Sequence, residues 1–136
     1  MFDKTTKILV VDDMKTMRMY VGNALGKLGF NNLTLANDGR EAWMCIESAR
    51  NDKIPYGLII SDWNMPKLDG LTLLKLVRGD GVIKNTPFLM VTAETEVAQV
   101  KEAITEGVNN YITKPFSAET FKAKLEAVYA NLKKAA

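Results

Sequence analysis

Five polar residues that are able to do chemistry stand directly after short apolar runs of the chain. These residues are Asp12, Asp13, Asp62, Thr92 and Lys114. Each run is typical of a buried β-strand, and the carboxyl ends of parallel strands meet at one edge of a sheet, where α/β proteins bind their ligands. An aspartate after a strand is most often a turn residue or a helix cap, so only the whole set of five residues indicates a functional site.

The three aspartates predict a metal site. Carboxylates that converge at one edge repel one another unless a cation lies between them, and oxygen ligands with retained water suit Mg²⁺. We expect Asp13, Asp62 and the backbone carbonyl of Asn64 to hold the ion. Asp12 is expected to complete the metal site through a metal-bound water.

The same set contains the groups that phosphoryl transfer needs. Magnesium and Lys114 would neutralise the phosphoryl oxygens, the hydroxyl of Thr92 would donate to one of them, and a carboxylate would attack in line. Taken singly, Thr92 is more simply a strand-end hydroxyl and Lys114 a solvated lysine. Their joint occurrence at strand ends favours the chemical interpretation.

Predicted strands alternate with helices along the whole chain. The strands cover five short runs: Lys7–Val11, Leu33–Ala36, Leu58–Ser61, Pro87–Thr92 and Asn110–Thr113. Apolar residues at helical spacing follow each strand, as in the stripe formed by Val97, Val100, Ile104 and Val108. Parallel strands need such crossovers, so we predict an α/β fold with a doubly wound five-stranded parallel sheet and helices on both faces.

Composition excludes several kinds of chemistry. The 136 residues include no histidine and one cysteine, Cys45, which rules out histidine-based triads, histidine-ligated zinc and an internal disulfide. A net charge of +2 with scattered lysines does not indicate a nucleic-acid surface, and no apolar run approaches the ~20 residues of a membrane span. We expect a single domain over residues 1–136, without a separate output domain, acting as a cytoplasmic monomer.

The ordered motifs resemble those of response-regulator receiver domains, and the resemblance covers essentially the whole chain. The matching motifs are Val10–Asp13, Ser61–Pro66 with Asp69-Gly70, Met90–Glu94 and Lys114–Phe116. The single-domain chemotaxis regulators of this family are the most similar, which implies a flavodoxin-like sheet with strand order 2-1-3-4-5. It also implies a two-component phosphoprotein that has no catalytic activity beyond its own phosphorylation and dephosphorylation.

The resemblance assigns a role to each candidate residue. Asp62 becomes the phosphoacceptor, and Asp12 and Asp13 become the acidic metal pair. Thr92 becomes the switch hydroxyl and Lys114 the lysine that contacts the phosphoryl group. Tyr111 becomes the switch aromatic, and phosphorylation is expected to move Thr92 toward Asp62 and the Tyr111 ring inward.

Partners also follow from the resemblance. It implies a histidine kinase as phosphodonor, the flagellar motor switch as target and a possible phosphatase. The target would bind a face made by the fourth helix, the fifth strand and the fifth helix, with Lys124 at its edge. Where the chemotaxis members carry lysines, this chain has Thr95, Glu96 and Val97, which leaves the choice of partner open.

Three other functions are compatible with parts of the pattern. A haloacid-dehalogenase-type phosphatase also uses an aspartate, a threonine, a lysine and Mg²⁺, but it needs a second aspartate where Asn64 stands. A flavodoxin-like carrier of FMN needs a phosphate loop where the acidic Asp12 and Asp13 would repel it. A stand-alone receiver outside chemotaxis would share the phosphorylation chemistry but regulate another process.

Three local features are predicted as well. Gly29 is expected to end the first helix, and Ser117 to cap the last one. The Lys114-Pro115 peptide is expected to be cis, because Lys114 must turn back over the site directly after a strand.

Overall fold

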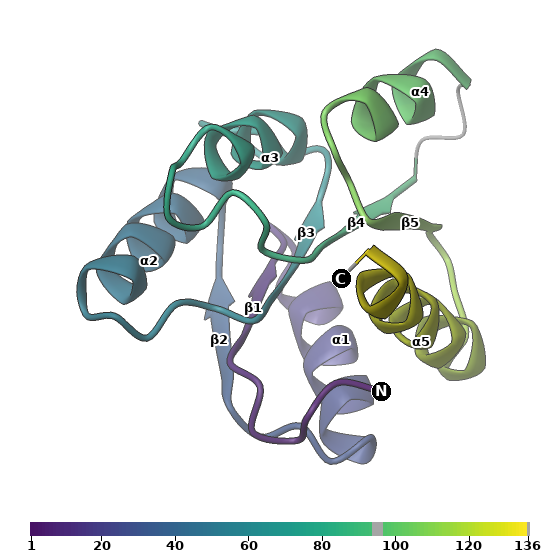
Figure 1. The fold of residues 1–136 in the computed structure, drawn as a ribbon. Coiled ribbons are helices and arrows are strands. Elements are labelled where there is room, and N and C mark those ends of the chain that lie inside the picture. Colours follow the sequence, from purple (N-terminus) through teal and green to yellow (C-terminus); the bar gives the residue numbers. More distant parts are fainter. Residues whose placement is uncertain (94–96, 136) are drawn as a thin grey trace.

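The computed structural model describes residues 1–93 and 97–135, which form one sheet and two layers of helices (Figure 1). The strands are β1 (Ile8–Val11), β2 (Leu33–Ala36), β3 (Leu58–Asp62), β4 (Phe88–Thr92) and β5 (Asn110–Thr113). All neighbouring strands are parallel, in the order β2-β1-β3-β4-β5, which confirms the predicted topology.

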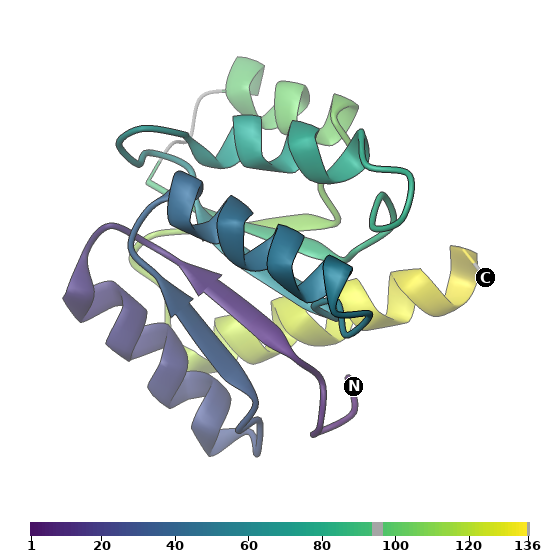
Figure 2. The same cartoon turned by 90° about the vertical axis from the view of Figure 1, so that its left-hand side faces the viewer.

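Five helices connect and follow these strands. They are α1 (Lys15–Lys27), α2 (Gly39–Asn51), α3 (Gly70–Arg78), α4 (Val97–Thr105) and α5 (Ala118–Ala135). The helices α1 and α5 lie on one side of the sheet, and α2, α3 and α4 lie on the other (Figures 1 and 2). Crossovers on both faces bury the sheet twice, which explains why the strands are apolar runs and not alternating patterns.

Two apolar clusters fill the space between these layers. Alternate strand residues serve opposite faces, so that Leu9 and Ile59 pack under α2 and α3, while Val10 and Ile60 pack against α1 and α5. Every residue of β1, β3 and β4 is buried. The sheet is therefore a rigid base for the residues at its carboxyl edge.

Helix ends follow local chemistry where the sequence predicted it. Gly29, at φ 95°, terminates α1, and the amide of Phe30 donates to the carbonyl of Leu25, as in a Schellman motif. The hydroxyl oxygen of Ser117 accepts the amide hydrogen of Thr120 at the start of α5, which confirms the predicted cap.

Three details differ from the prediction. Asp62 is the last residue of β3 and not the first residue of the loop, because its position still pairs with Val91. Ile104 does not belong to the buried stripe of α4: it is 58% exposed, while Ala103 is 1% exposed. The helix ends at Thr105, so the predicted stripe residue Val108 lies beyond it, and the helix turns the small residue Ala103 toward the sheet.

The Lys114-Pro115 peptide is cis, as predicted. None of the helices in the described ranges is both long and apolar enough to cross a lipid bilayer.

Candidate functional site

The carboxyl edge of the sheet gathers the predicted polar residues at the ends of β1, β3 and β4. Asp12, Asp62 and Thr92 are 3%, 7% and 2% exposed, whereas Asp13 is open to solvent. Buried ionisable groups are costly unless they are paired or bind a cation. The acidic residues of this cluster therefore need a positively charged partner.

Lys114 joins the two buried carboxylates. Its Nζ lies 2.9 Å from Oδ2 of Asp12 and 3.3 Å from Oδ2 of Asp62. The lysine directly follows β5, and the cis peptide after it begins the turn into α5. One lysine thus offsets part of the negative charge of the cluster and leaves room for a further cation.

The carboxylate of Asp62 sits in an environment that opposes its charge. Burial raises the pKa of Asp62, the negative charge of Asp12 raises it further, and Lys114 lowers it. The backbone amide of Trp63 donates to Oδ1 of Asp62 at 2.8 Å. A divalent cation at this position would relieve the remaining repulsion.

The acidic cluster fits such a cation. One carboxylate oxygen each from Asp12, Asp13 and Asp62 can be chosen so that all three lie within 4.8 Å of one another. An all-oxygen set with open positions for water is the ligand chemistry that Mg²⁺ prefers. The residues present therefore fit the predicted metal.

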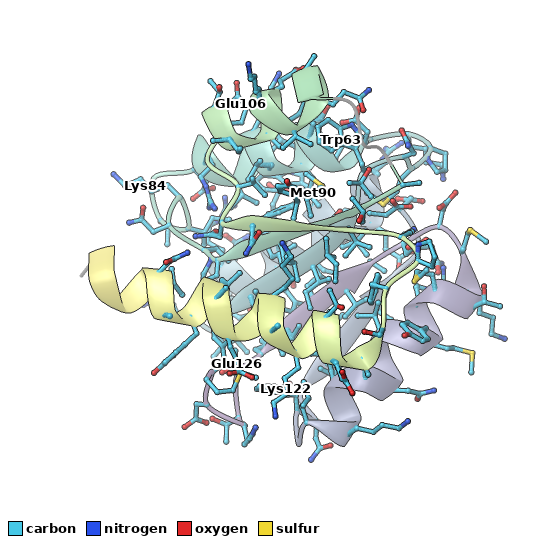
Figure 3. All side chains as sticks on the ribbon, turned by 90° about the vertical axis from the view of Figure 1, so that its right-hand side faces the viewer. Trp63, Lys84, Met90, Glu106, Lys122 and Glu126 are labelled. Atoms are coloured by element: carbon cyan, nitrogen blue, oxygen red, sulfur yellow. The ribbon has the colours of Figure 1, made fainter. Side chains whose placement is uncertain are left out.

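The loop after β3 is closed tightly behind Asp62. The amide of Gly70 donates to the carbonyl of Trp63 at 2.8 Å, and a Cβ at Gly70 would lie 2.3 Å from the carbonyl oxygen of Asp62. Only a glycine allows this approach. The closed loop contains Asn64, two residues after Asp62, while the Trp63 and Met90 side chains fill the side of the sheet that α3 covers (Figure 3).

The predicted switch residues lie on adjacent strands. Thr92 is the last residue of β4, and Tyr111 pairs with Met90 in the neighbouring strand β5. The Nζ of Lys124 lies 5.2 Å from the centre of the half-buried Tyr111 ring. The sequence placed Lys124 and Tyr111 on one face but did not pair them, because their contact crosses from α5 to β5.

Two of the residues that set this chain apart from the chemotaxis pattern, Thr95 and Glu96, lie outside the described residues. Val97 is the first residue of α4.

Comparison with known proteins identifies the class. Residues 8–126 match the response regulator receiver domain family, and the chain therefore belongs to this family. Domains of this family are signalling switches and not classical enzymes, and they bind Mg²⁺ in an acidic pocket.

The particular type follows from individual relatives. The chain is 45% identical to chemotaxis protein CheY-3 of Vibrio cholerae over 130 residues, which cover 96% of each protein. It is 44% identical to CheY1 of Helicobacter pylori over 122 residues, 90% of this chain and 95% of that protein. The protein is the receiver domain of a CheY-like chemotaxis response regulator.

Solved structures agree with this assignment. The chemotaxis response regulator CheY4 of Vibrio cholerae superimposes with a TM-score of 0.81 at 36% identity, covering 91% of this chain and 98% of that one. The CheX–CheY–BeF3–Mg complex of Borrelia burgdorferi gives a TM-score of 0.81 at 26% identity, covering 91% and 89%. These matches favour the receiver interpretation over the dehalogenase-type and flavodoxin-type alternatives.

The structure thus brings Asp12, Asp13, Asp62 and Lys114 into one cluster, with Thr92 at the end of the adjacent strand. The individual roles assigned to these residues remain predictions. Sequence reasoning missed Arg18, whose guanidinium bonds to the backbone of Asp12. A basic residue one turn into a helix carries no signal that its partner is a backbone carbonyl.

Proposed function

We propose that this protein accepts a phosphoryl group on Asp62 from a histidine kinase, in a reaction that requires Mg²⁺. The observation that supports this most is the pairing of buried Asp62 with Lys114, beside the acidic side chains of Asp12 and Asp13. A buried carboxylate whose charge is only partly balanced is a nucleophile that a cation and a phosphoryl group can both approach.

In the proposed reaction, an Asp62 carboxylate oxygen attacks phosphorus in line. The new O–P bond forms as the N–P bond of the donor phosphohistidine breaks, and the electron pair stays on the imidazole nitrogen. Lys114 offsets charge on the phosphoryl oxygens, and the Thr92 hydroxyl donates to one of them. Bound Mg²⁺ would be held by Asp13, Asp62 and the Asn64 carbonyl, near Asp12, and would neutralise further charge.

Water later hydrolyses the acyl phosphate, so the protein acts as a switch with self-phosphorylation and self-dephosphorylation activity. We propose that it works in the cytoplasm as a monomer, and that a separate phosphatase can accelerate its reset. Its CheY relatives support a target in chemotaxis, with the flagellar motor switch as the proposed partner.

We propose that phosphorylation of Asp62 changes side-chain positions on β4 and β5. A phosphoryl oxygen at Asp62 gives Thr92 a new acceptor, and movement of Thr92 frees space for the Tyr111 ring. The contact between Lys124 and Tyr111 would carry this change to the face made by α4, β5 and α5. The target can shift the equilibrium between the two conformations of this face only by as much as its affinity for them differs.

Intact mass spectrometry with acetyl phosphate tests the acceptor. Wild type should gain one phosphoryl group in Mg²⁺, and neither Asp62→Asn nor wild type in EDTA should do so. Asp69→Asn is the matched control, because Asp69 lies in the same loop and caps α3 through an oxygen that asparagine retains. Equal uptake by wild type and Asp62→Asn would overturn the assignment.

The switch is tested by affinity for a motor-switch peptide with beryllofluoride at Asp62. We expect beryllofluoride to strengthen binding in wild type and to lose much of this effect in Thr92→Ala and Tyr111→Ala. The same gain in all three proteins would refute the coupling of Thr92 to Tyr111 and leave the phosphorylation site intact.

A further inference from the structure

The start of α1 is held in an unusual way. Its N-cap residue is Met14, which makes no side-chain capping bond among the described residues, and no acidic residue stands in its first turn. Arg18 instead reaches back from the first turns of the helix, and its Nη1 donates to the backbone carbonyl of Asp12 at 2.7 Å. The helix is thereby tied to the acidic cluster itself.

This bond completes the hydrogen bonding of Asp12. Its amide donates to Ala36 O at 3.2 Å, Oδ1 accepts from the amide of Met14 at 2.9 Å, and Oδ2 accepts from Lys114 at 2.9 Å. The carbonyl is the fourth polar group, and Arg18 is its partner. Because Asp12 is buried, water would replace this bond poorly if the Arg18 side chain were removed.

The Asp12 carbonyl belongs to the peptide group that leads into Asp13. Orienting that carbonyl orients the peptide plane, and with it the direction in which the Asp13 side chain leaves the backbone. Asp13 is exposed, so surrounding side chains restrict it less than they restrict Asp12. The placement of its carboxylate therefore depends strongly on the backbone.

We propose that Arg18 is a positioning residue for the metal site, acting through the backbone carbonyl of Asp12 to hold the Asp13 carboxylate near that of Asp62. This inference rests on the proposed Mg²⁺ site. Arg18 would not touch the ion. Its positive charge near the site repels Mg²⁺, so its charge and its positioning role change the affinity in opposite directions.

Because the two effects have opposite signs, the Mg²⁺ affinity of an Arg18 variant distinguishes between them. Mg²⁺ is titrated by calorimetry, with the fluorescence of the two tryptophans, Trp43 and Trp63, as a second signal, into wild type, Arg18→Met and Lys15→Met. Lys15 is the matched control, since it is exposed on the same first turn and its loss removes the same charge. Arg18→Met should bind Mg²⁺ about tenfold more weakly, the equivalent of one charge-assisted hydrogen bond. Lys15→Met should bind equally well or more tightly.

Arg18→Lys keeps the charge and one donor, and it should recover part of the affinity. Urea unfolding of each variant checks the fold. Arg18 is only half-buried, so its loss should leave the core intact. If Arg18→Met does not fold, Arg18→Lys carries the test: because lysine lacks the planar fork, it should bind more weakly than wild type.

Equal or tighter binding by Arg18→Met overturns the positioning role. So does equal binding by Arg18→Lys, should that variant have to carry the test. The proposed metal site itself is tested separately by Asp13→Asn. If wild type shows no saturable Mg²⁺ binding, or Asp13→Asn binds as well as wild type, the metal site is wrong and not only the role of Arg18.

Discussion

Replacing Arg78 by methionine should lower the free energy of unfolding more than the loss of a charge at the surface does. The guanidinium at the end of α3 binds four acceptors: Nε donates to Gly107 O at 3.0 Å, Nη1 to Lys84 O at 3.0 Å and Thr86 O at 2.7 Å, and Nη2 to Asn109 Oδ1 at 2.9 Å. It thereby ties the loop before β4 to the turn between α4 and β5.

The size of the effect follows from the surroundings of these bonds. The bonds to Thr86 and Asn109 are partly buried, whereas those to Gly107 and Lys84 are exposed, so water replaces the exposed pair. The two partly buried bonds, at about 1–1.5 kcal/mol each, predict a loss of about 2–3 kcal/mol. Burial lowers the pKa of Arg78, which reflects a desolvation cost that methionine avoids, so the lower end of the range is expected.

Urea unfolding followed by circular dichroism measures this loss. The control is Arg40→Met, because Arg40 is an exposed residue of α2. Surface substitutions of this kind usually change the free energy of unfolding by no more than about 0.5 kcal/mol. If Arg78→Met loses no more stability than Arg40→Met, with the same dependence on urea, then the four neutral acceptors of Arg78 do not stabilise the fold.

Two further results are expected. A Cβ at Gly39 would lie 2.0 Å from the carbonyl oxygen of Leu68, so Gly39→Ala should lower the free energy of unfolding by about 1–3 kcal/mol. The space around Gly22 is open, so Gly22→Ala in the helix α1 should raise it by up to about 1 kcal/mol. Equal urea midpoints for the two variants would contradict this expectation. Because burial raises the pKa of Asp62, protonation favours the folded state, and the stabilisation present below the unfolded pKa is lost as pH rises through the raised folded pKa. In Mg²⁺-free buffer, the urea midpoint of wild type should therefore fall relative to that of Asp62→Asn as the pH rises from about 4 to about 7. Parallel pH profiles for the two proteins would argue against the raised pKa of Asp62.

Local chemistry and periodicity were enough to predict a parallel sheet with helices on both faces and the edge where the polar residues meet, whereas the strand order followed from the family resemblance. Short apolar runs that end in Asp12, Asp62 and Thr92 indicate parallel strands, and parallel strands bring their carboxyl ends together whatever the details of packing. Gly29 and Ser117 act on their own neighbours within a few residues, so their roles could also be predicted. These features depend on backbone geometry that each segment carries with it.

Tertiary structure decided which side chains meet across segments. Spacing placed Ile104 in the stripe of α4, but the rotation of a short helix is set by what it packs on, and Ala103 faces the sheet instead. The contacts of Arg18 with Asp12 and of Arg78 with Thr86 both end on a backbone carbonyl. Every residue has such a carbonyl, so residue types alone cannot identify the partner; only the folded chain, by bringing one acceptor within reach and excluding water from it, selects the bond.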